Sequence, residues 1–371
     1  MLQKALALVF ALASIAGCVG CSTTSHFLYA TLPAANQLAV YREDPRAGVL
    51  TQIDGSPYSV GDGAHSVIIH PSGKFLYVAN PGQNENDISL FSIESNGVLD
   101  EVFPRTTVTP LGSEPELLLM DSAGTYLYAE NAASNNISVF SINTAGTDCP
   151  QGTKAPGCLT QVSGSPFPIG LAPLNMVLAP SGNFLYVTAA SQPLGLVAAF
   201  SITAGKLQLL SLTSTGGVNP FGLAIDPSGK HLYVANTSSN SISIFDIGSA
   251  GALTQVSGSP LADTYNDPVA MILDPKGQFL YVANQASNNV SVYSISSTTG
   301  LPTGLTTSTS FFAFATATGP TVLSFDPDGN HLFVGAQGSP GIQSFQVTQG
   351  NLNPIFTYKV GNSPTSIAVT P

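Results

Sequence analysis

Ile225–Asn236 reads Ile-Asp-Pro-Ser-Gly-Lys-His-Leu-Tyr-Val-Ala-Asn, and this phrase recurs along most of the chain. Its variants occupy Ile69–Asn80, Leu273–Asn284, Met120–Asn131, Leu178–Ala189 and Phe325–Ala336. The leucine before the aromatic residue falls at positions 28, 76, 127, 185, 232, 280 and 332, so the spacings are 48, 51, 58, 47, 48 and 52 residues. A repeat of about fifty residues is the length of one β-propeller blade.

One period predicts short strands separated by turns. In the fourth period we expect strands over Phe221–Asp226, His231–Asn236, Ser241–Ile247 and Leu253–Ser257. The first turn is residues 227–229, where proline fixes φ and glycine supplies a conformation that other residues avoid. These strands are apolar along most of their length, as in sheets that are buried on both faces. The sequence therefore predicts an all-β fold built from four-stranded antiparallel blades.

The two ends of the chain each carry part of a period. Residues 26–31 begin in mid-period, and residues 365–371 form a first strand with nothing after it. Together they complete one blade, so six full periods and one composite blade give seven. We predict a single seven-bladed β-propeller domain over residues 26–371, closed by pairing of the C-terminal strand with the N-terminal blade.

The first 25 residues differ in character. Lys4 precedes an apolar run over residues 5–16, too short to cross a bilayer, which ends Ile-Ala-Gly-Cys at Cys18. This ending resembles the bacterial lipobox, whose cysteine is lipidated and becomes the mature N-terminus. We expect a lipoprotein signal peptide over residues 1–17, a tether over residues 18–25, and an exported protein held in the cell envelope by lipid on Cys18. An ordinary secretory signal is the alternative.

Charge argues against a nucleic-acid partner. The chain has 10 basic and 21 acidic residues, a net charge of −11, and charged residues make up only 8%. Binding to a phosphate backbone requires clustered Lys and Arg, and the arginines are only Arg42, Arg46 and Arg105. We expect a monomer that touches the membrane only through its lipid.

The repeated Tyr-Val-Ala-Asn phrase, the Asp-Pro-Ser-Gly turns and the count of seven resemble the lactonase-type propellers. That family includes 6-phosphogluconolactonases, carboxymuconate-lactonizing enzymes and related Tyr-Val-Thr-Asn repeat proteins. The resemblance covers about residues 25–371. The chain has no Trp, which excludes Trp-Asp repeats, quinoprotein blades and the Asp-boxes of sialidases. The resemblance implies a lactone hydrolase whose site lies at one mouth of the central channel.

Alignment on the Pro-x-Gly turns shows which residues occupy that mouth. The ring is His65, Glu116, Leu174, Phe221, Val269, Thr321 and Thr365. Only His65 and Glu116 are of types that move protons in such a reaction, and they belong to adjacent blades. The resemblance implies a similar His and Glu, so we predict these two as the catalytic residues. The alternative is that both are ordinary polar residues at a wet channel mouth.

The family resemblance also implies arginines that bind a carboxylate or phosphate of the substrate. No arginine falls in the ring. Arg105, in the stretch that leads to Glu116, is the candidate substrate contact. We therefore favour an uncharged or weakly anionic lactone over a phosphorylated one. The alternative function is a non-catalytic propeller that binds a carbohydrate-derived ligand or a protein partner on one face.

The remaining cysteines and histidines are interpreted structurally. Cys149 and Cys158 flank the one long insertion, and in an oxidising compartment they would form a disulfide. His231 and His331 stand where other periods have Phe, which predicts packing residues. No two histidines have metal-ligand spacing and no Cys–His cluster is present, so we expect no metal and no cofactor.

Overall fold

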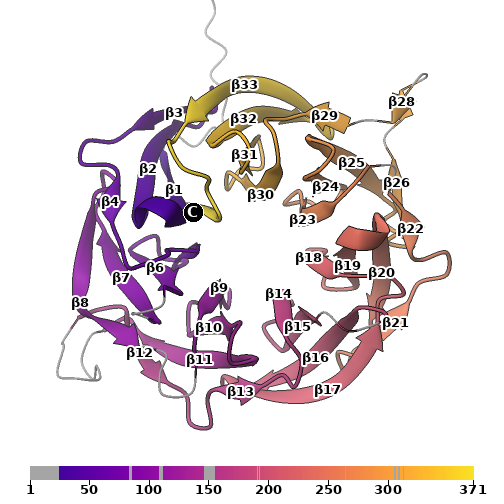
Figure 1. The fold of residues 1–371 in the computed structure, drawn as a ribbon, viewed down its shortest axis with the longest axis horizontal. Helices are drawn as coiled ribbons and strands as arrows, with labels where there is room; N and C mark the ends of the chain where they lie inside the picture. The colour runs from indigo at the N-terminus through magenta and orange to yellow at the C-terminus, as the bar shows by residue number, and fades with distance from the viewer. Residues whose placement is uncertain are drawn as a thin grey trace, which may run out of the picture.

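The strands form a ring of seven blades, as Figure 1 shows for the computed structural model. The structure describes residues 25–82, 86–107, 112–145, 155–189, 191, 193–263, 265–304, 306–307, 310–311 and 313–371. Each blade has four main antiparallel strands, with the first strand nearest the centre of the ring. The predicted all-β seven-bladed fold is confirmed. Within the described residues, no helix is long and apolar enough to span a membrane.

The composite blade combines both ends of the chain. Its strands are β34 (Ile367–Val369), β1 (His26–Leu32), β2 (Gln37–Asp44), β3 (Val49–Gln52) and the short β4 (Tyr58–Ser59). The predicted pairing is confirmed, because Leu28, Tyr29 and Ala30 of β1 lie opposite Val369, Ala368 and Ile367 of β34. Backbone hydrogen bonds from Thr370 to Phe27 (2.9 Å) and from Thr31 to Ser366 (3.1 Å) extend it at both ends. This pairing joins the two ends of the chain in one sheet and closes the ring.

Blades 1 to 3 follow in chain order. Blade 1 has β5 (Ser66–Ile69), β6 (Phe75–Asn80), β7 (Asp87–Ile93) and β8 (Leu99–Thr107). Blade 2 has β9 (Pro115–Met120), β10 (Tyr126–Asn131), β11 (Asn136–Asn143), β12 (Cys158–Gln161) and β13 (Phe167–Pro168). Blade 3 has β14 (Pro173–Leu178), β15 (Phe184–Ala189), β16 (Leu196–Thr203) and β17 (Lys206–Ser214).

Blades 4 to 6 complete the ring. Blade 4 has β18 (Pro220–Ile225), β19 (His231–Asn236), β20 (Ser241–Ile247), β21 (Leu253–Gln255) and β22 (Leu261–Ala262), within one or two residues of the predicted bounds. Blade 5 has β23 (Pro268–Leu273), β24 (Phe279–Asn284), β25 (Asn289–Ile295), β26 (Pro302–Gly304) and β29 (Ala313–Ala315), with the hairpin β27 (Thr306–Thr307) and β28 (Ser310–Phe311) between the last two. Blade 6 has β30 (Pro320–Phe325), β31 (His331–Ala336), β32 (Gly341–Thr348) and β33 (Asn351–Lys359).

A buried aromatic residue in each second strand ties neighbouring blades together. The third residue of the recurring Phe-Leu-Tyr phrase is Tyr in six blades and Phe333 in blade 6, and all seven are at most 1% exposed. Four of the tyrosine hydroxyls donate to a glycine carbonyl of the next blade: Tyr29 to Gly97 (3.1 Å), Tyr77 to Gly157 (2.6 Å), Tyr186 to Gly251 (3.0 Å) and Tyr233 to Gly300 (2.8 Å). A buried hydroxyl needs such a partner. The motif therefore combines apolar packing with a directional contact that fixes blade against blade.

Candidate functional site

Irregular pairing at the start of the inner strands leaves one or two residues unpaired in five of the seven blades. In β9, Pro115 and Leu117 pair with consecutive residues of β10, so Glu116 between them is left without a partner. The same shift skips Leu174, Val269 and Thr321, and in β18 it skips Phe221 together with Gly222. A β-bulge of this kind leaves a residue unpaired and redirects its side chain. The bulges therefore account for five of the seven positions of the ring predicted from the sequence, and His65 and Thr365 lie just before the regular part of their strands.

All seven residues of this ring line one cavity of about 430 Å³. The other described residues that line it are Ser66, Leu117, Glu130, Asn175, Asn219, Thr237, Ala270, Gln285, Gln337 and Ser366. None of the described lining residues is Lys or Arg. The structure thus brings His65 and Glu116 together at a shared cavity, and it makes the charged part of the wall acidic.

The cavity wall is divided into two arcs. Leu174, Phe221 and Val269 come from the consecutive blades 3, 4 and 5 and form an apolar arc. Phe221 keeps 39% of its surface exposed, so a large ring faces the open space. The opposite arc holds Thr365, His65 and Glu116. Ligand sites commonly combine an apolar lining with a few polar groups, and this arrangement suits a small ligand with one apolar and one polar side.

The orientation of His65 is fixed by backbone groups. Its Nδ1 lies 2.9 Å from the carbonyl oxygen of Glu116. A carbonyl only accepts, so Nδ1 carries the proton and Nε2 of the neutral ring has the free lone pair. The His65 carbonyl accepts in turn from the Thr365 and Thr31 hydroxyls, at 2.7 and 3.2 Å. Glu116, which the sequence analysis predicted as a catalytic partner of His65, thus contacts the imidazole through its backbone carbonyl rather than its carboxylate.

Glu130 is a site residue that the sequence analysis did not single out. It lies on β10 opposite Leu117, lines the cavity and is only 2% exposed. Burial first, and then repulsion from the Glu116 carboxylate, raises the pKa of Glu130 from 4.5 to about 8. A carboxyl group with such a pKa is protonated at neutral pH and donates a hydrogen bond or a proton.

A departure from the repeat marks Glu130. The equivalent second-strand position is small in every other blade: Thr31, Ala79, Thr188, Ala235, Ala283 and Gly335. Thr188 and Thr31 use their hydroxyls there to bind the carbonyls of Phe221 and His65 in the next blade, at 3.3 and 3.2 Å. The position therefore faces the ring. Comparison of the repeats shows a glutamate there in place of a small residue, and this departure could have identified Glu130 from the sequence.

The predicted substrate contact Arg105 is not at the cavity. It lies on β8, the outermost strand of blade 1, where its Nε donates to Glu101 Oε1 at 2.6 Å and its guanidinium lies over the Phe103 ring. Arg42 and Arg46 belong to β2 and the turn after it, also away from the cavity. The predicted lipidation site Cys18 lies outside the described residues. Cys158 is buried at the start of β12, whereas Cys149 lies outside the described residues, so their pairing stays a prediction.

The match to a family model defines the class of protein. The model for the lactonase seven-bladed β-propeller matches residues 21–155, 170–259 and 222–314. The chain belongs to this lactonase family of seven-bladed β-propellers. The resemblance predicted from the repeats is thereby confirmed.

Individual relatives agree with this assignment. The chain is 30% identical over 201 residues to a 6-phosphogluconolactonase of Blochmanniella pennsylvanica, over 53% of this chain and 56% of that protein. It is 42% identical over 82 residues to a 6-phosphogluconolactonase of Formosa agariphila, over 21% of this chain and 22% of that protein. The chain thus spans about half of the first relative and about a fifth of the second.

Solved structures share the fold. The periplasmic gluconolactonase of Pseudomonas aeruginosa superposes with a TM-score of 0.73 at 18% identity, over 94% of this chain and 99% of that one. A protein from Lactobacillus plantarum gives a TM-score of 0.75 at 20% identity, over 94% of this chain and 99% of that one. At these identities the likeness concerns the fold alone.

Proposed function

We propose that this protein hydrolyses an uncharged lactone in the central cavity, with His65 as general base and Glu130 as general acid. The observation that carries the proposal is their convergence: an imidazole whose Nδ1–H is fixed by a carbonyl and a buried carboxyl with a raised pKa line the same cavity. The chain also belongs to the lactonase family, and the relatives it matches are named as lactonases.

The proposed reaction uses each group once. His65 Nε2 takes a proton from water, and the resulting hydroxide oxygen attacks the lactone carbonyl carbon. The bond between that carbon and the ring oxygen breaks, and Glu130 donates its proton to the leaving alkoxide. The product is an open-chain hydroxy acid, which releases its own proton at neutral pH. Proton exchange with solvent returns His65 to its neutral form and Glu130 to its protonated form.

Glu116 has two supporting roles in this proposal. Its carbonyl orients the His65 ring, and its carboxylate helps to keep Glu130 protonated. Loss of the first effect would change the orientation of the general base, and loss of the second would change the protonation of the general acid. Two carboxyls whose surroundings separate their pKa values are a common way to provide an acid at neutral pH.

The cavity lining supports an uncharged substrate. With Glu116 and Glu130 in the wall and no Lys or Arg among the described lining residues, a phosphate group would meet repulsion and no cationic partner. The apolar arc of Leu174, Phe221 and Val269 favours a lactone with a hydrocarbon side. We therefore place aliphatic and unphosphorylated sugar lactones ahead of phosphorylated ones.

A lactone panel assayed with the wild-type protein and His65→Ala tests the function. General acid–base catalysis contributes about 10²–10⁴-fold, so kcat/KM of His65→Ala should fall by about that factor. His231→Phe is the matched control, because it removes a histidine outside the cavity. It introduces phenylalanine, which other blades have at the equivalent position, as Phe75 and Phe279. Equal rates in wild type and His65→Ala, or no turnover of any lactone, would contradict hydrolysis and favour the non-catalytic binding propeller.

We also propose that the protein is exported and anchored in the cell envelope by lipid on Cys18. The support is the sequence pattern over residues 1–18, which lie outside the described residues. Mass spectrometry of cell-derived protein should find a diacyl or triacyl group on an N-terminal Cys18. An intact Met1 would contradict the proposal.

A further inference from the structure

A second buried glutamate departs from the repeat, at the interface between blade 6 and the composite blade. Glu43 on β2 occupies a third-strand position that is apolar in the other six blades: Ile93, Ile142, Ile202, Ile247, Ile295 and Val347. Across the interface, His331 on β31 replaces the Phe or Tyr that five blades have at this point. A contact that is apolar at five other interfaces has thus become a contact between two ionisable side chains.

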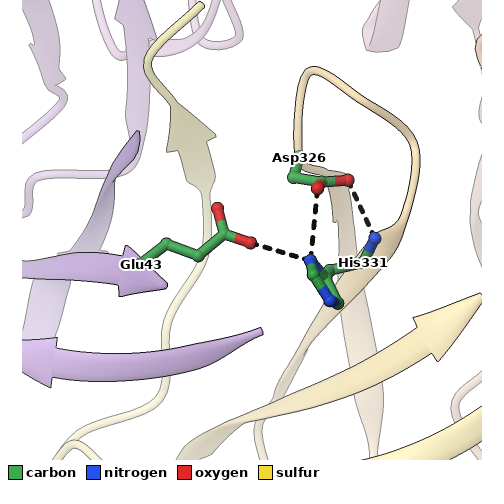
Figure 2. A group of neighbouring side chains, drawn as sticks. All are labelled: Glu43, Asp326 and His331. Carbon is green, nitrogen blue, oxygen red and sulfur yellow. Dashed lines mark hydrogen bonds and ion pairs between the residues drawn. The ribbon is translucent and has the colours of Figure 1, made fainter. Parts of the chain in front are cut away.

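Three side chains converge at this interface, as Figure 2 shows. His331 Nδ1 lies 3.0 Å from Glu43 Oε1 and 3.2 Å from Asp326 Oδ2, and the three ligand atoms lie within 4.8 Å of one another. All three residues are at most 2% exposed. Asp326 Oδ1 also accepts from the His331 backbone N–H at 2.8 Å, which fixes the aspartate relative to the ring. The cluster, defined as Glu43, Asp326 and His331, is therefore preorganised and buried.

The cluster has two acidic side chains and only one basic side chain. One Nδ1–H donates well to only one acceptor, yet two carboxylates approach that atom. Neither oxygen of Glu43 has a hydrogen-bond partner of good geometry in the described residues. With both carboxyls ionised and His331 protonated, the cluster carries one net negative charge, and a buried unpaired charge is strongly destabilising.

A divalent cation satisfies the same groups without residual charge. Two carboxylates and one neutral imidazole sum to zero with a 2+ ion. Ligand atoms bound at about 2.0–2.2 Å in a tetrahedral site lie roughly 3.3–3.6 Å apart, so the two contacts to Nδ1, at 3.0 and 3.2 Å, would lengthen slightly around an ion. Imidazole nitrogen and carboxylate oxygen together suit Zn²⁺ and Mn²⁺, whereas Ca²⁺ takes six to eight oxygens.

A second histidine lies on the strand next to Glu43. His26 on β1 pairs with Glu43 across the strands and is 5% exposed. Its Nδ1 lies 3.2 Å from the Thr370 carbonyl, which leaves the Nε2 lone pair free in the neutral ring. That buried Nε2 has no hydrogen-bond partner in the described residues. A histidine whose other nitrogen donates to a carbonyl is the usual form of a metal ligand.

We propose that Glu43, Asp326 and His331 form a structural binding site for a divalent transition-metal ion, with His26 as the candidate fourth ligand. The ion would join N-terminal strand β2 to blade 6, where only non-covalent contacts hold the two segments together. The ligands come from positions 26, 43, 326 and 331, so no local spacing in the sequence indicates them. The site is separate from the cavity, and its test does not depend on lactone hydrolysis.

Metal content and thermal stability test the proposal on the purified full chain. The protein is stripped with a chelator, reloaded with Zn²⁺ or Mn²⁺, dialysed and analysed by inductively coupled plasma mass spectrometry. We expect one equivalent of metal and a Tm higher by roughly 3–4 °C at a hundredfold excess over Kd. Ca²⁺ should give neither, and an equal shift with Ca²⁺ would overturn the transition-metal assignment.

The decisive variant is Glu43→Ile/His331→Phe, which restores the apolar contact of the other blades and so preserves packing. It should bind no metal at this site and show no metal-dependent shift in Tm. His231→Phe is the matched control, because it removes the Asp226–His231 contact of blade 4 (3.1 Å) and should keep the metal. Less than stoichiometric metal in the wild type, or equal metal and equal shifts in the double variant, would overturn the proposal. If the double variant does not fold, Glu43→Gln is assayed for the same two readouts.

Discussion

The two buried glutamates, Glu130 in the cavity wall and Glu43 in the closing interface, have opposite surroundings. Each replaces a small or apolar residue of the repeat, and each is at most 2% exposed. Glu43, in the composite blade, lies 3.0 Å from His331 of the neighbouring blade 6 and close to Asp326 of the same blade. Glu130 has no hydrogen-bonding or cationic partner among the described residues, and its ionisable neighbour is another carboxylate.

This difference separates stability from function. A buried carboxyl that is clustered with complementary groups joins two segments of the fold, whereas one without partners lowers stability and persists where its proton is useful. The closing interface is therefore expected to affect unfolding and the cavity wall to affect activity. The variants below test that division, beginning with the largest expected change.

Removal of the last strand should have the largest effect on stability. Deletion of residues 364–371 removes β34 and with it the pairing to Leu28, Tyr29 and Ala30. The composite blade then loses its inner strand and the ring has two open edges. We expect Tm to fall by more than about 10 °C in calorimetry or circular dichroism. An unchanged Tm would contradict closure by this strand.

In the metal-loaded protein, Glu43→Ala should lower the free energy of unfolding by about 3–5 kcal/mol, because it leaves a cavity and removes a ligand of the ion. Glu43→Ile/His331→Phe should be close to neutral in chelator-treated protein, because it replaces the whole contact by the apolar one of the other blades. Urea unfolding measures both. Equal losses in the two variants would show that packing volume, rather than the cluster, determines stability here.

Glu130→Ala should stabilise the protein, by about 1 kcal/mol or more, while lactone hydrolysis falls. The substitution introduces alanine, which three other blades have at the equivalent position, as Ala79, Ala235 and Ala283. Since the pKa of Glu130 is about 8 when folded and 4.5 in the reference state, the folded protein holds the extra proton. Wild-type stability should therefore decline as pH rises from about 4.5 to about 8, and the variant should lack that part of the decline. A variant less stable than wild type at pH 8 would contradict an unpartnered Glu130.

Much of the fold followed from the repeats, because their phrase encodes strand, turn and interface at once. The same alignment placed His65 and Glu116 in the cavity ring, since equivalent positions in a propeller meet at its axis. Glu130 was missed because a candidate search confined to the ring ignores the neighbouring strand, although its departure from alanine was visible in the sequence. Arg105 was misjudged because nearness in sequence to Glu116 says nothing about which edge of a blade a residue occupies. Glu43 and His331 are almost three hundred residues apart, and only ring closure brings them together.

The pH dependence of kcat/KM for the best uncharged lactone tests the account of the cavity most directly. This quantity reports the ionisation of the free enzyme's essential groups. If Glu130 is the acid, kcat/KM should fall tenfold per pH unit above about pH 8, after correction for spontaneous hydrolysis. Glu116→Gln removes a repelling charge, which lowers the pKa of Glu130 and should move this decline to lower pH. A profile without a decline up to pH 10, or one that Glu116→Gln leaves in place, would contradict Glu130 as the proton donor.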